Sequence, residues 1–371
     1  MKILIVCTRL SFGGAERVAV MWANGFVEKG HEVMVVSNLF DPITYQINQR
    51  VLVRNLVSDN QRKWKKWGSA LGNVRKAVKE FQPDVVIGVM STCSIIARMA
   101  TIGKGIPVIA TEHNSFDRPS SAPLGKWEKI TKFFLNRAYS HVTVLTEADR
   151  QYIGTRLNNV KVMPNPLALQ PVEMIPEKKK VLLAAGRLDV WHTKGFDLLI
   201  CAWGKVNRQL TIDNEQWTIS YNNWRLQIAG TGSGESLQYL KQLCKESGVE
   251  NSVDFLGFRT DIEELYKQSE IFVLSSRYEG FGLVLIEAMS QGCACVACDY
   301  KGRQREIITD DSMGLCCEPD NVEALASNIK KMIEDEEYRK SVQLKAIERS
   351  KYYSIDNIMD RWETLLTQIV N

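Results

Sequence analysis

The sequence predicts an α/β protein with two domains, each built on a parallel sheet wrapped by helices. In both halves of the chain, short apolar runs rich in β-branched residues alternate with amphipathic helix patterns, as in strand–helix–strand units. The 371 residues are too many for one ordinary hydrophobic core. Residues 163–167 contain two prolines and lead into a polar segment up to Lys180, which indicates an interdomain linker. We therefore expect two Rossmann-like domains that face a central cleft.

The expected elements follow one another in a regular order. In the first half, strands are expected at 3–7, 32–37, 85–89, 108–111 and 142–145, and helices at about 14–29 and 94–102. In the second half, strands are expected at 180–185, 225–229, 253–255, 271–274 and 293–297. Residues 208–224 are polar and longer than an ordinary connection, so we expect a surface insertion there, to which we assign no function. A last helix pattern covers residues 352–370.

The composition is that of a soluble globular protein, with 45% hydrophobic and 24% charged residues. No apolar run approaches the ~20 residues that span a bilayer, and the first residues do not have the pattern of a signal peptide. Nine cysteines without regular spacing favour a reducing cytosol over a disulfide framework. Because no histidine lies near Cys293, Cys295 and Cys298, we expect these to be structural thiols.

The charges are unevenly distributed along the chain. Residues 1–167 contain 23 Lys and Arg against 12 Asp and Glu, a net charge of +11, whereas the remaining residues contain 24 against 31, a net charge of −7. This asymmetry predicts that the first half meets an anionic surface or substrate. No nucleic-acid partner is expected.

Two glutamates flank the predicted start of a helix that follows a buried-looking strand. Glu279 lies on the loop, and Glu287 lies about one turn into the helix. Between them, the backbone N–H groups of Phe281, Gly282 and Leu283 lack helical partners at the positive end of the helix dipole. They can hold an anion while the carboxylates accept hydrogen bonds from hydroxyl groups on either side. A nucleotide sugar has this layout; the plainer alternative is a structural unit whose glutamates are solvated caps.

The segment that contains both glutamates resembles the Glu-x7-Glu signature of family 4, the retaining glycosyltransferases with the GT-B fold, and the resemblance extends over nearly the whole chain. It implies that Glu279 binds hydroxyls of the donor hexose and Glu287 the ribose diol. It also implies an acceptor-binding domain at 1–167, a nucleotide-sugar domain at 168–351, and a terminal helix at 352–371 that packs back on the first domain.

Two cations lie near the expected strand ends of the second domain. Arg187 ends a strand and Lys194 stands just before the next helix, so both would lie at the carboxyl edge of the sheet, where α/β folds bind ligands. An arginine fork and an ammonium group suit a diphosphate, although either residue alone could be a solvated surface cation. Their placement is similar to the diphosphate-binding pair of the family.

Glycine-bearing loops supply further candidate donor contacts. The Gly-Gly turn that ends at Gly14 is similar to the N-terminal glycine loop of the family; structural turns of this kind are at least as common. Residues 230–234 do not have the spacing of a dinucleotide fingerprint, and Thr231 stands where the family usually has an acidic residue. Phe258 and Arg259 lie in a segment that resembles the loop holding the nucleobase.

His113 follows an expected strand of the first domain. A lone histidine is by default a structural residue, but this position is similar to the active-site histidine of the family, which lies near the C6 hydroxyl of the donor sugar. We therefore take His113 and Glu279 as the candidate catalytic residues.

A helix pattern at 61–81 combines an apolar stripe with many basic residues. The stripe consists of Trp64, Trp67, Leu71, Val74, Val78 and Phe81. Such a stripe either packs on a sheet or, with Trp and Lys at one end, docks on an anionic leaflet at ~1 kcal/mol per basic residue. Together with the basic first half, it favours a peripheral membrane enzyme.

These features predict a transferase that moves a hexose or N-acetylhexosamine from a nucleotide-diphosphate sugar, taken as UDP-linked, and the family resemblance implies that it retains the configuration of the sugar. The opening Gly-Gly-Ala-Glu-Arg resembles the subgroup that extends polyprenyl-diphosphate-linked glycans for capsule, lipopolysaccharide O-antigen or protein glycosylation, at the cytoplasmic face of the bacterial plasma membrane. Because there is no Asp-x-Asp metal motif, we expect neither a metal nor another cofactor. Two alternatives remain open: a nucleotide-sugar epimerase of the same architecture, and a noncatalytic nucleotide-sugar-binding partner of a glycan assembly.

Overall fold

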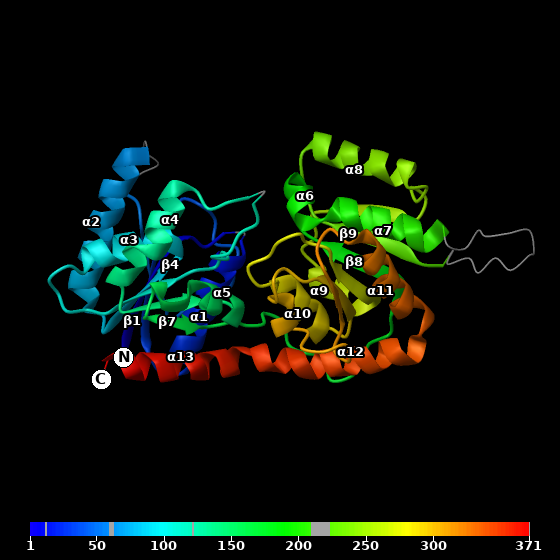
Figure 1. Ribbon diagram of the computed structural model, residues 1–371. Coiled ribbons are helices and arrows are strands. Elements are labelled where there is room, and N and C mark those ends of the chain that lie inside the picture. The colour runs from blue at the N-terminus through cyan, green and yellow to red at the C-terminus, as the bar shows by residue number, and fades with distance from the viewer. Residues whose placement is uncertain (12, 59–62, 121, 209–222, 371) are drawn as a thin grey trace, which may run out of the picture. The chain divides into compact units, whose positions relative to one another are not determined.

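The computed structural model describes residues 1–11, 13–58, 63–120, 122–208 and 223–370 (Figure 1). The chain forms two compact units: Met1–Ala168 together with Ser354–Asn371, and Leu169–Tyr353. Each unit contains one parallel sheet with helices on both faces. The predicted α/β class with two parallel sheets is therefore confirmed.

The first unit has a seven-stranded parallel sheet in the order β3-β2-β1-β4-β5-β6-β7. Its strands are β1 (Lys2–Arg9), β2 (Glu32–Asn38), β3 (Leu52–Asn55), β4 (Val85–Val89), β5 (Val108–Thr111), β6 (His141–Val144) and β7 (Val160–Val162). The central strands are apolar on both sides, because helices cover both faces of the sheet.

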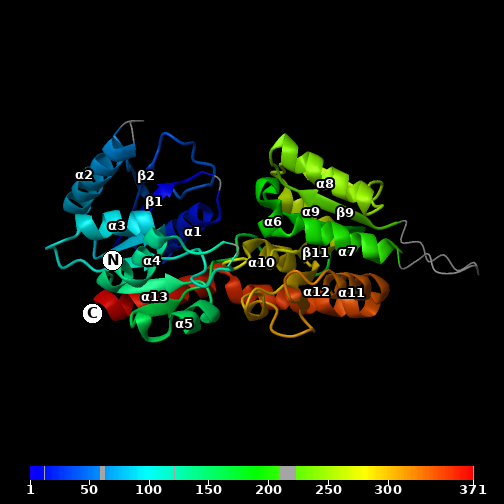
Figure 2. The ribbon, with the colours of Figure 1, turned by 45° about the horizontal axis from the view of Figure 1, so that its top comes forward.

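The helices of the first unit are α1 (Gly14–Glu28), α2 (Lys63–Phe81), α3 (Met90–Ala100), α4 (Lys126–Phe133), α5 (Glu147–Ile153) and α13 (Ile355–Val370), with the 3₁₀ turns η1 (Leu135–Ala138) and η2 (Gly154–Arg156). Figures 1 and 2 show α13 beside α1. The buried ring of Trp362 lies 5.0 Å from that of Trp22 and 5.8 Å from that of Phe26. The end of the chain thus completes the core of the unit that begins it.

The apolar stripe of α2 faces the interior. Val74, Val78 and Phe81 are buried in the cluster that also contains residues of β1, β2 and α3, and Leu71 packs against it. Trp67, 45% exposed, is the outlying member of the stripe; Trp64 lies outside the described side chains. Of the two interpretations of this stripe, packing on the sheet is the one that the structure supports.

The second unit has a six-stranded parallel sheet in the order β10-β9-β8-β11-β12-β13. Its strands are β8 (Lys179–Ala185), β9 (Arg225–Ala229), β10 (Val253–Gly257), β11 (Ser269–Leu274), β12 (Ala294–Cys298) and β13 (Leu315–Cys317). Its helices are α6 (Trp191–Lys194), α7 (Phe196–Arg208), α8 (Gly234–Glu246), α9 (Ile262–Gln268), α10 (Leu283–Ser290), α11 (Val322–Glu334) and α12 (Glu336–Ser350), with η3 (Leu188–Val190), η4 (Gln304–Glu306) and η5 (Lys351–Tyr353). One face of the sheet packs against α7, α8 and α11.

Three further expectations concern this part of the chain. The insertion expected at 208–224 lies almost entirely outside the described residues. All nine cysteines are free, and Cys293, Cys295 and Cys298 are buried in or beside β12. Burial raises the pKa of the Cys293 thiol to about 11, so it stays protonated. Within the described residues, no three His, Cys, Asp or Glu side chains gather as metal ligands, and no helix of the described chain is long and apolar enough to span a bilayer.

Candidate functional site

Glu279 and Lys194 form an ion pair at the carboxyl edge of the second sheet. The Lys194 Nζ lies 2.6 Å from the Glu279 Oε1, and the Ser276 hydroxyl donates a hydrogen bond of 2.8 Å to the same oxygen. Both charged side chains are partly exposed. The loop after β11 therefore presents a carboxylate and an ammonium group together, and both can reach a ligand from solvent.

A glycine makes this contact possible. Gly195 follows Lys194 with a φ of +64°, and a Cβ there would lie 1.8 Å from the carbonyl oxygen of Ser275. The Ser275 hydroxyl in turn donates a hydrogen bond of 3.0 Å to the carbonyl of Lys194. The turn between α6 and α7 thus presses against the end of β11, which brings Lys194 to Glu279 across 85 residues of sequence.

The start of α10 lies directly beyond Glu279. Gly282 caps the helix with a φ of +106° and supplies no side chain, so the first N–H groups of α10 have no side-chain cap. Phe281 is buried, and Leu283 begins the helix. These N–H groups lie at the positive end of the helix dipole, which attracts anions.

Glu287 lies in the second turn of α10 and is buried. The hydroxyl of Tyr266 donates a hydrogen bond of 3.4 Å to its Oε2 atom. Glu287 therefore differs from Glu279: it is held inside the unit by its own helix and by α9, whereas Glu279 lies on an accessible loop.

The loops after β8 and β10 carry the other candidates of the second unit. Arg187 is exposed directly after β8, and the N–H of the next residue, Leu188, donates to the carbonyl of Thr231, which ties this loop to that of β9. Phe258 is exposed after β10. The guanidinium of Arg259 makes a bidentate pair with Asp261, with N–O distances of 2.6 and 2.8 Å.

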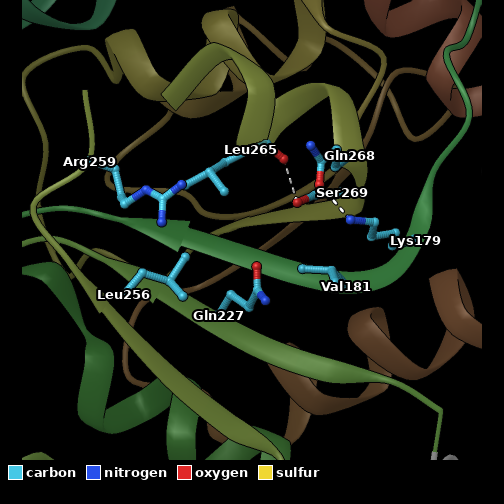
Figure 3. Close-up of a pocket in the computed structure, with 8 residues that line it drawn as sticks. All are labelled: Lys179, Val181, Gln227, Leu256, Arg259, Leu265, Gln268 and Ser269. Atoms are coloured by element: carbon cyan, nitrogen blue, oxygen red, sulfur yellow. Dashed lines mark hydrogen bonds between the residues drawn. The ribbon is translucent and has the colours of Figure 1, made fainter. Parts of the chain in front are cut away.

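A pocket of about 160 Å³ in the second unit has Arg259 among its lining residues (Figure 3). Arg259 lies at one end of it and Lys179 at the other, with Gln227 and Val181 on the strands between them. The remaining lining residues are Leu256, Leu265, Gln268 and Ser269. Of the candidate residues only Arg259 lines this pocket, so it is separate from the Glu279–Lys194 pair.

The first unit carries its candidates at the carboxyl ends of β1 and β5. Gly14 begins α1, and the preceding Gly13 exchanges hydrogen bonds with the hydroxyl of Tyr45, which accepts from the Gly13 N–H at 3.3 Å and donates to its carbonyl at 3.2 Å. A Cβ on Gly13 would lie 2.1 Å from a carboxylate oxygen of Glu16. The carboxylate end of Glu16 is flexible and can move away from such a Cβ, so the hydrogen bonds with Tyr45 are what hold this turn.

His113 follows β5, with its Nε2 atom 3.2 Å from the Thr111 hydroxyl and its ring 5.5 Å from that of Trp22. Its Nδ1 atom is buried. Withdrawal from water lowers the pKa of His113 to about 4, although the charge of Glu112 and the Asn165 side chain act in the opposite direction. The ring is therefore neutral near pH 7.

A buried ion pair beside His113 was missed in the sequence analysis. The Lys132 Nζ lies 2.8 Å from the Glu112 Oε2, and both side chains are only 3% exposed. Lys132 also donates to the carbonyl of Asn114 at 3.1 Å, so it holds the residues on both sides of His113. Nothing in the sequence around Lys132, which lies in a short, highly charged helix, distinguishes it from a surface lysine.

Family models match adjoining parts of the chain. The model described as Glycosyltransferase Family 4 matches residues 12–170, and the model described as Glycosyl transferases group 1 matches residues 168–349. The match at 168–349 contains Glu279, Lys194 and α10, and the match at 12–170 contains His113.

Relatives match the chain over its length. It is 28% identical, over 96% of its length and 97% of the relative's, to an uncharacterized glycosyltransferase of Haemophilus influenzae. It is also 28% identical, over its whole length and 99% of the relative's, to a Campylobacter jejuni enzyme. That enzyme is the GalNAc-α-(1→4)-GalNAc-α-(1→3)-diNAcBac-PP-undecaprenol α-1,4-N-acetyl-D-galactosaminyltransferase.

Solved structures share the fold. Sucrose-phosphate synthase from Thermosynechococcus elongatus matches with a TM-score of 0.81 at 16% identity, over 99% of this chain and 98% of that one. The Anabaena protein HepE, in complex with UDP, matches with a TM-score of 0.77 at 19% identity, over 99% of this chain and all of that one.

Proposed function

Because this chain belongs to the group 1, family 4 glycosyltransferases with the GT-B fold, we propose that it transfers a hexose or N-acetylhexosamine from a UDP-sugar, with retention of configuration, to a polyprenyl-diphosphate-linked saccharide. The observation that carries the proposal is the Glu279–Lys194 pair beside the uncapped start of α10. The named transferases among its relatives do not favour an epimerase or a noncatalytic partner.

The donor diphosphate would lie between Lys194, Arg187 and the first N–H groups of α10. These groups supply the positive charge that a departing diphosphate needs, so the proposed transfer requires no metal. Lys194 is already held by Glu279 at 2.6 Å, which fixes its ammonium group before the ligand arrives. Glu279 would accept hydrogen bonds from donor hexose hydroxyls, and Glu287 from the ribose diol.

The sugar would be transferred by attack on the same face from which UDP departs, with a phosphate oxygen of the leaving group taking the proton of the acceptor. His113 would contact the C6 hydroxyl of the donor sugar. Since its pKa is lowered to about 4, it would do so as a neutral ring that both donates and accepts hydrogen bonds. Gly14, Phe258 and Arg259 are the further proposed donor contacts.

The acceptor and location of the enzyme are proposed from charge and from its relatives. The Campylobacter relative is named for an undecaprenol-diphosphate-linked glycan, and such an acceptor carries two or more negative charges. Residues 1–167, with 23 basic against 12 acidic side chains, suit both this acceptor and an anionic membrane surface. We place the enzyme in cell-surface glycan synthesis, capsule or lipopolysaccharide included, peripherally on the cytoplasmic face of the bacterial plasma membrane.

The donor is tested by thermal unfolding with UDP, GDP and ADP in the presence of EDTA. A nucleotide at a hundred times its dissociation constant stabilises a protein by ~2.7 kcal/mol, so UDP should raise the midpoint without added metal. The Glu287→Ala variant should lose most of this shift, whereas Glu318→Ala, at an exposed glutamate of the same unit, should keep it. A midpoint that no nucleotide moves, or that moves only with Mg²⁺, contradicts the proposed donor site.

A further inference from the structure

Helix α4 (Lys126–Phe133) presents a row of large apolar side chains to solvent. Trp127, Ile130 and Phe134 are 66%, 45% and 66% exposed, and their spacing of three and four residues puts them on one side of the helix. Single exposed apolar residues are ordinary, but Trp127 and Ile130 on α4 and Phe134 directly after it form one patch, here called the α4 patch. Such a patch marks a surface that meets another body.

The opposite side of α4 is held firmly by the first unit. Lys132 is buried against Glu112, and the ring of Phe133 packs at 5.6 Å on that of Phe116. Arg118 pairs at 2.8 Å with Glu128 in the first turn. The helix therefore cannot turn its apolar side inward without breaking the buried contacts beside His113.

The exposed charged side chains of α4 and of the η1 turn that follows it are basic. Lys126, Lys129 and Arg137 are exposed on the same helix and on the η1 turn that follows it. The one acidic residue of α4, Glu128, is neutralised by Arg118. Aromatic and aliphatic side chains bordered by lysine and arginine form the kind of surface that enters the headgroup region of an anionic bilayer.

We infer that the α4 patch docks the first unit on an anionic lipid surface, with Trp127, Ile130 and Phe134 among the headgroups and the cations over negative lipids. This inference rests on the proposed function, because a lipid-linked acceptor lies in a membrane. It assigns docking to α4 rather than to α2, whose stripe from Leu71 to Phe81 is used in the core. A second copy of the chain, with its acidic half, is the competing occupant.

Vesicle flotation tests the inference, with vesicles of phosphatidylcholine alone and of phosphatidylcholine mixed with phosphatidylglycerol. The wild type should float with the mixed vesicles, and the Trp127→Ser, Ile130→Ser, Phe134→Ser triple variant should bind them about tenfold or more weakly, since apolar burial and charge both contribute to such binding. The Lys126→Gln, Lys129→Gln, Arg137→Gln variant should lose the preference for phosphatidylglycerol. The matched control is Met99→Ser with Ile102→Ser, which removes exposed apolar side chains elsewhere in the same unit and should bind as the wild type does.

Each outcome has one meaning. If the triple variant floats as the wild type does, the α4 patch is not the docking surface. If the wild type binds neither vesicle, or binds both equally, anionic-membrane docking is wrong, while the UDP-induced shift in unfolding midpoint tests the transferase proposal separately. If the wild type is a dimer and does not float with either vesicle, and the triple variant is a monomer, a second copy of the chain covers the patch. That result overturns the inference. An unchanged transition of the first unit in urea denaturation shows that the triple variant is folded, because the substituted residues lie in that unit.

Discussion

His113 lies next to a charged pair that is almost wholly withdrawn from water. Glu112 and Lys132 are bonded at 2.8 Å, and the Ser91 hydroxyl donates to Glu112 at 3.1 Å. The Lys132 ammonium also lies 3.9 Å from the centre of the Phe116 ring. Because Lys132 contacts residues on both sides of His113, it acts as a positioning residue for that ring.

Replacing Lys132 should destabilise the first unit. Lys132→Met leaves the Glu112 carboxylate buried and without its cation, and removing one partner of a buried pair costs about 3–5 kcal/mol. Urea denaturation measures the free energy of unfolding. Lys129→Met, on the exposed side of the same helix, should change it by less than ~0.5 kcal/mol; equal effects of the two substitutions would mean that the pair is not what holds this region.

The lowered pKa of His113 predicts a pH dependence of stability. The ring titrates near 6.5 in the unfolded chain and at about 4 in the folded one. Between these values the unfolded state binds more protons, so the free energy of unfolding falls as the pH falls from 6.5 towards 4.

The dependence is checked by urea denaturation at several pH values in that window. His113→Asn should show a shallower loss of stability than the wild type, whereas His192→Asn, at an exposed histidine, should follow the wild type. Parallel curves for the wild type and His113→Asn would contradict the burial of a neutral ring.

Among the elements, the turn between α6 and α7 decides where Lys194 lies. Gly195 has a left-handed φ of +64° and a Cβ would meet the Ser275 carbonyl oxygen at 1.8 Å. Gly248 has a similar φ of +69°, but nothing lies within 4 Å of its Cβ position. Alanine substitutions at these two glycines therefore distinguish the cost of an unfavourable φ, present at both, from the cost of a collision, present only at Gly195.

Gly248→Ala should lower the free energy of unfolding by about 1–2 kcal/mol, the cost of a left-handed residue with a side chain. Gly195→Ala should lower it further, because the loop after β11 must move, and should also weaken UDP binding by displacing Lys194. Calorimetric titration of both variants with UDP checks this. An unchanged affinity in Gly195→Ala would show that the turn does not hold the donor site.

The sequence predicted the central strands well and the edges of the sheets poorly. Each expected strand is present with its ends within two residues of the expected ones, because buried parallel strands are continuous apolar runs. The strands that were missed, β3, β7 and β13, are short and each lies at the edge of its sheet, where less of the strand is buried and the apolar signal is weaker.

In the candidate site, too, one part could be predicted from the sequence and another part could not. The motif around Glu279 and Glu287 could be found because its residues are adjacent in sequence. The contact of Glu279 with Lys194 joins residues 85 positions apart and depends on the fit of Gly195 against Ser275, and the pairing of Lys132 with Glu112 depends on how α4 packs. Local patterns do not contain such contacts.

In the whole molecule, each unit has its own core, and the first is completed by the last helix of the chain. Trp362 is fully buried against Trp22 and Phe26. Trp362→Ala should therefore destabilise the first unit by about 3–5 kcal/mol and leave the UDP-dependent transition of the second unit in place. Denaturation followed with and without UDP separates the two transitions.

The control is Val370→Ala, at an exposed position of the same helix, which should change neither transition. A loss of the UDP shift in Trp362→Ala would show that the units do not unfold independently.

The return of α13 to the first unit has a consequence for synthesis on the ribosome. Residues 1–168 emerge first, yet the surface around Trp22 and Phe26 stays open until 355–370 have been made. At ~5–20 residues per second, the roughly 200 intervening residues take about 10–40 s. The unit translated second is contiguous and can fold once residue 353 has emerged, whereas the apolar surface around Trp22 and Phe26 stays open to chaperones until α13 follows.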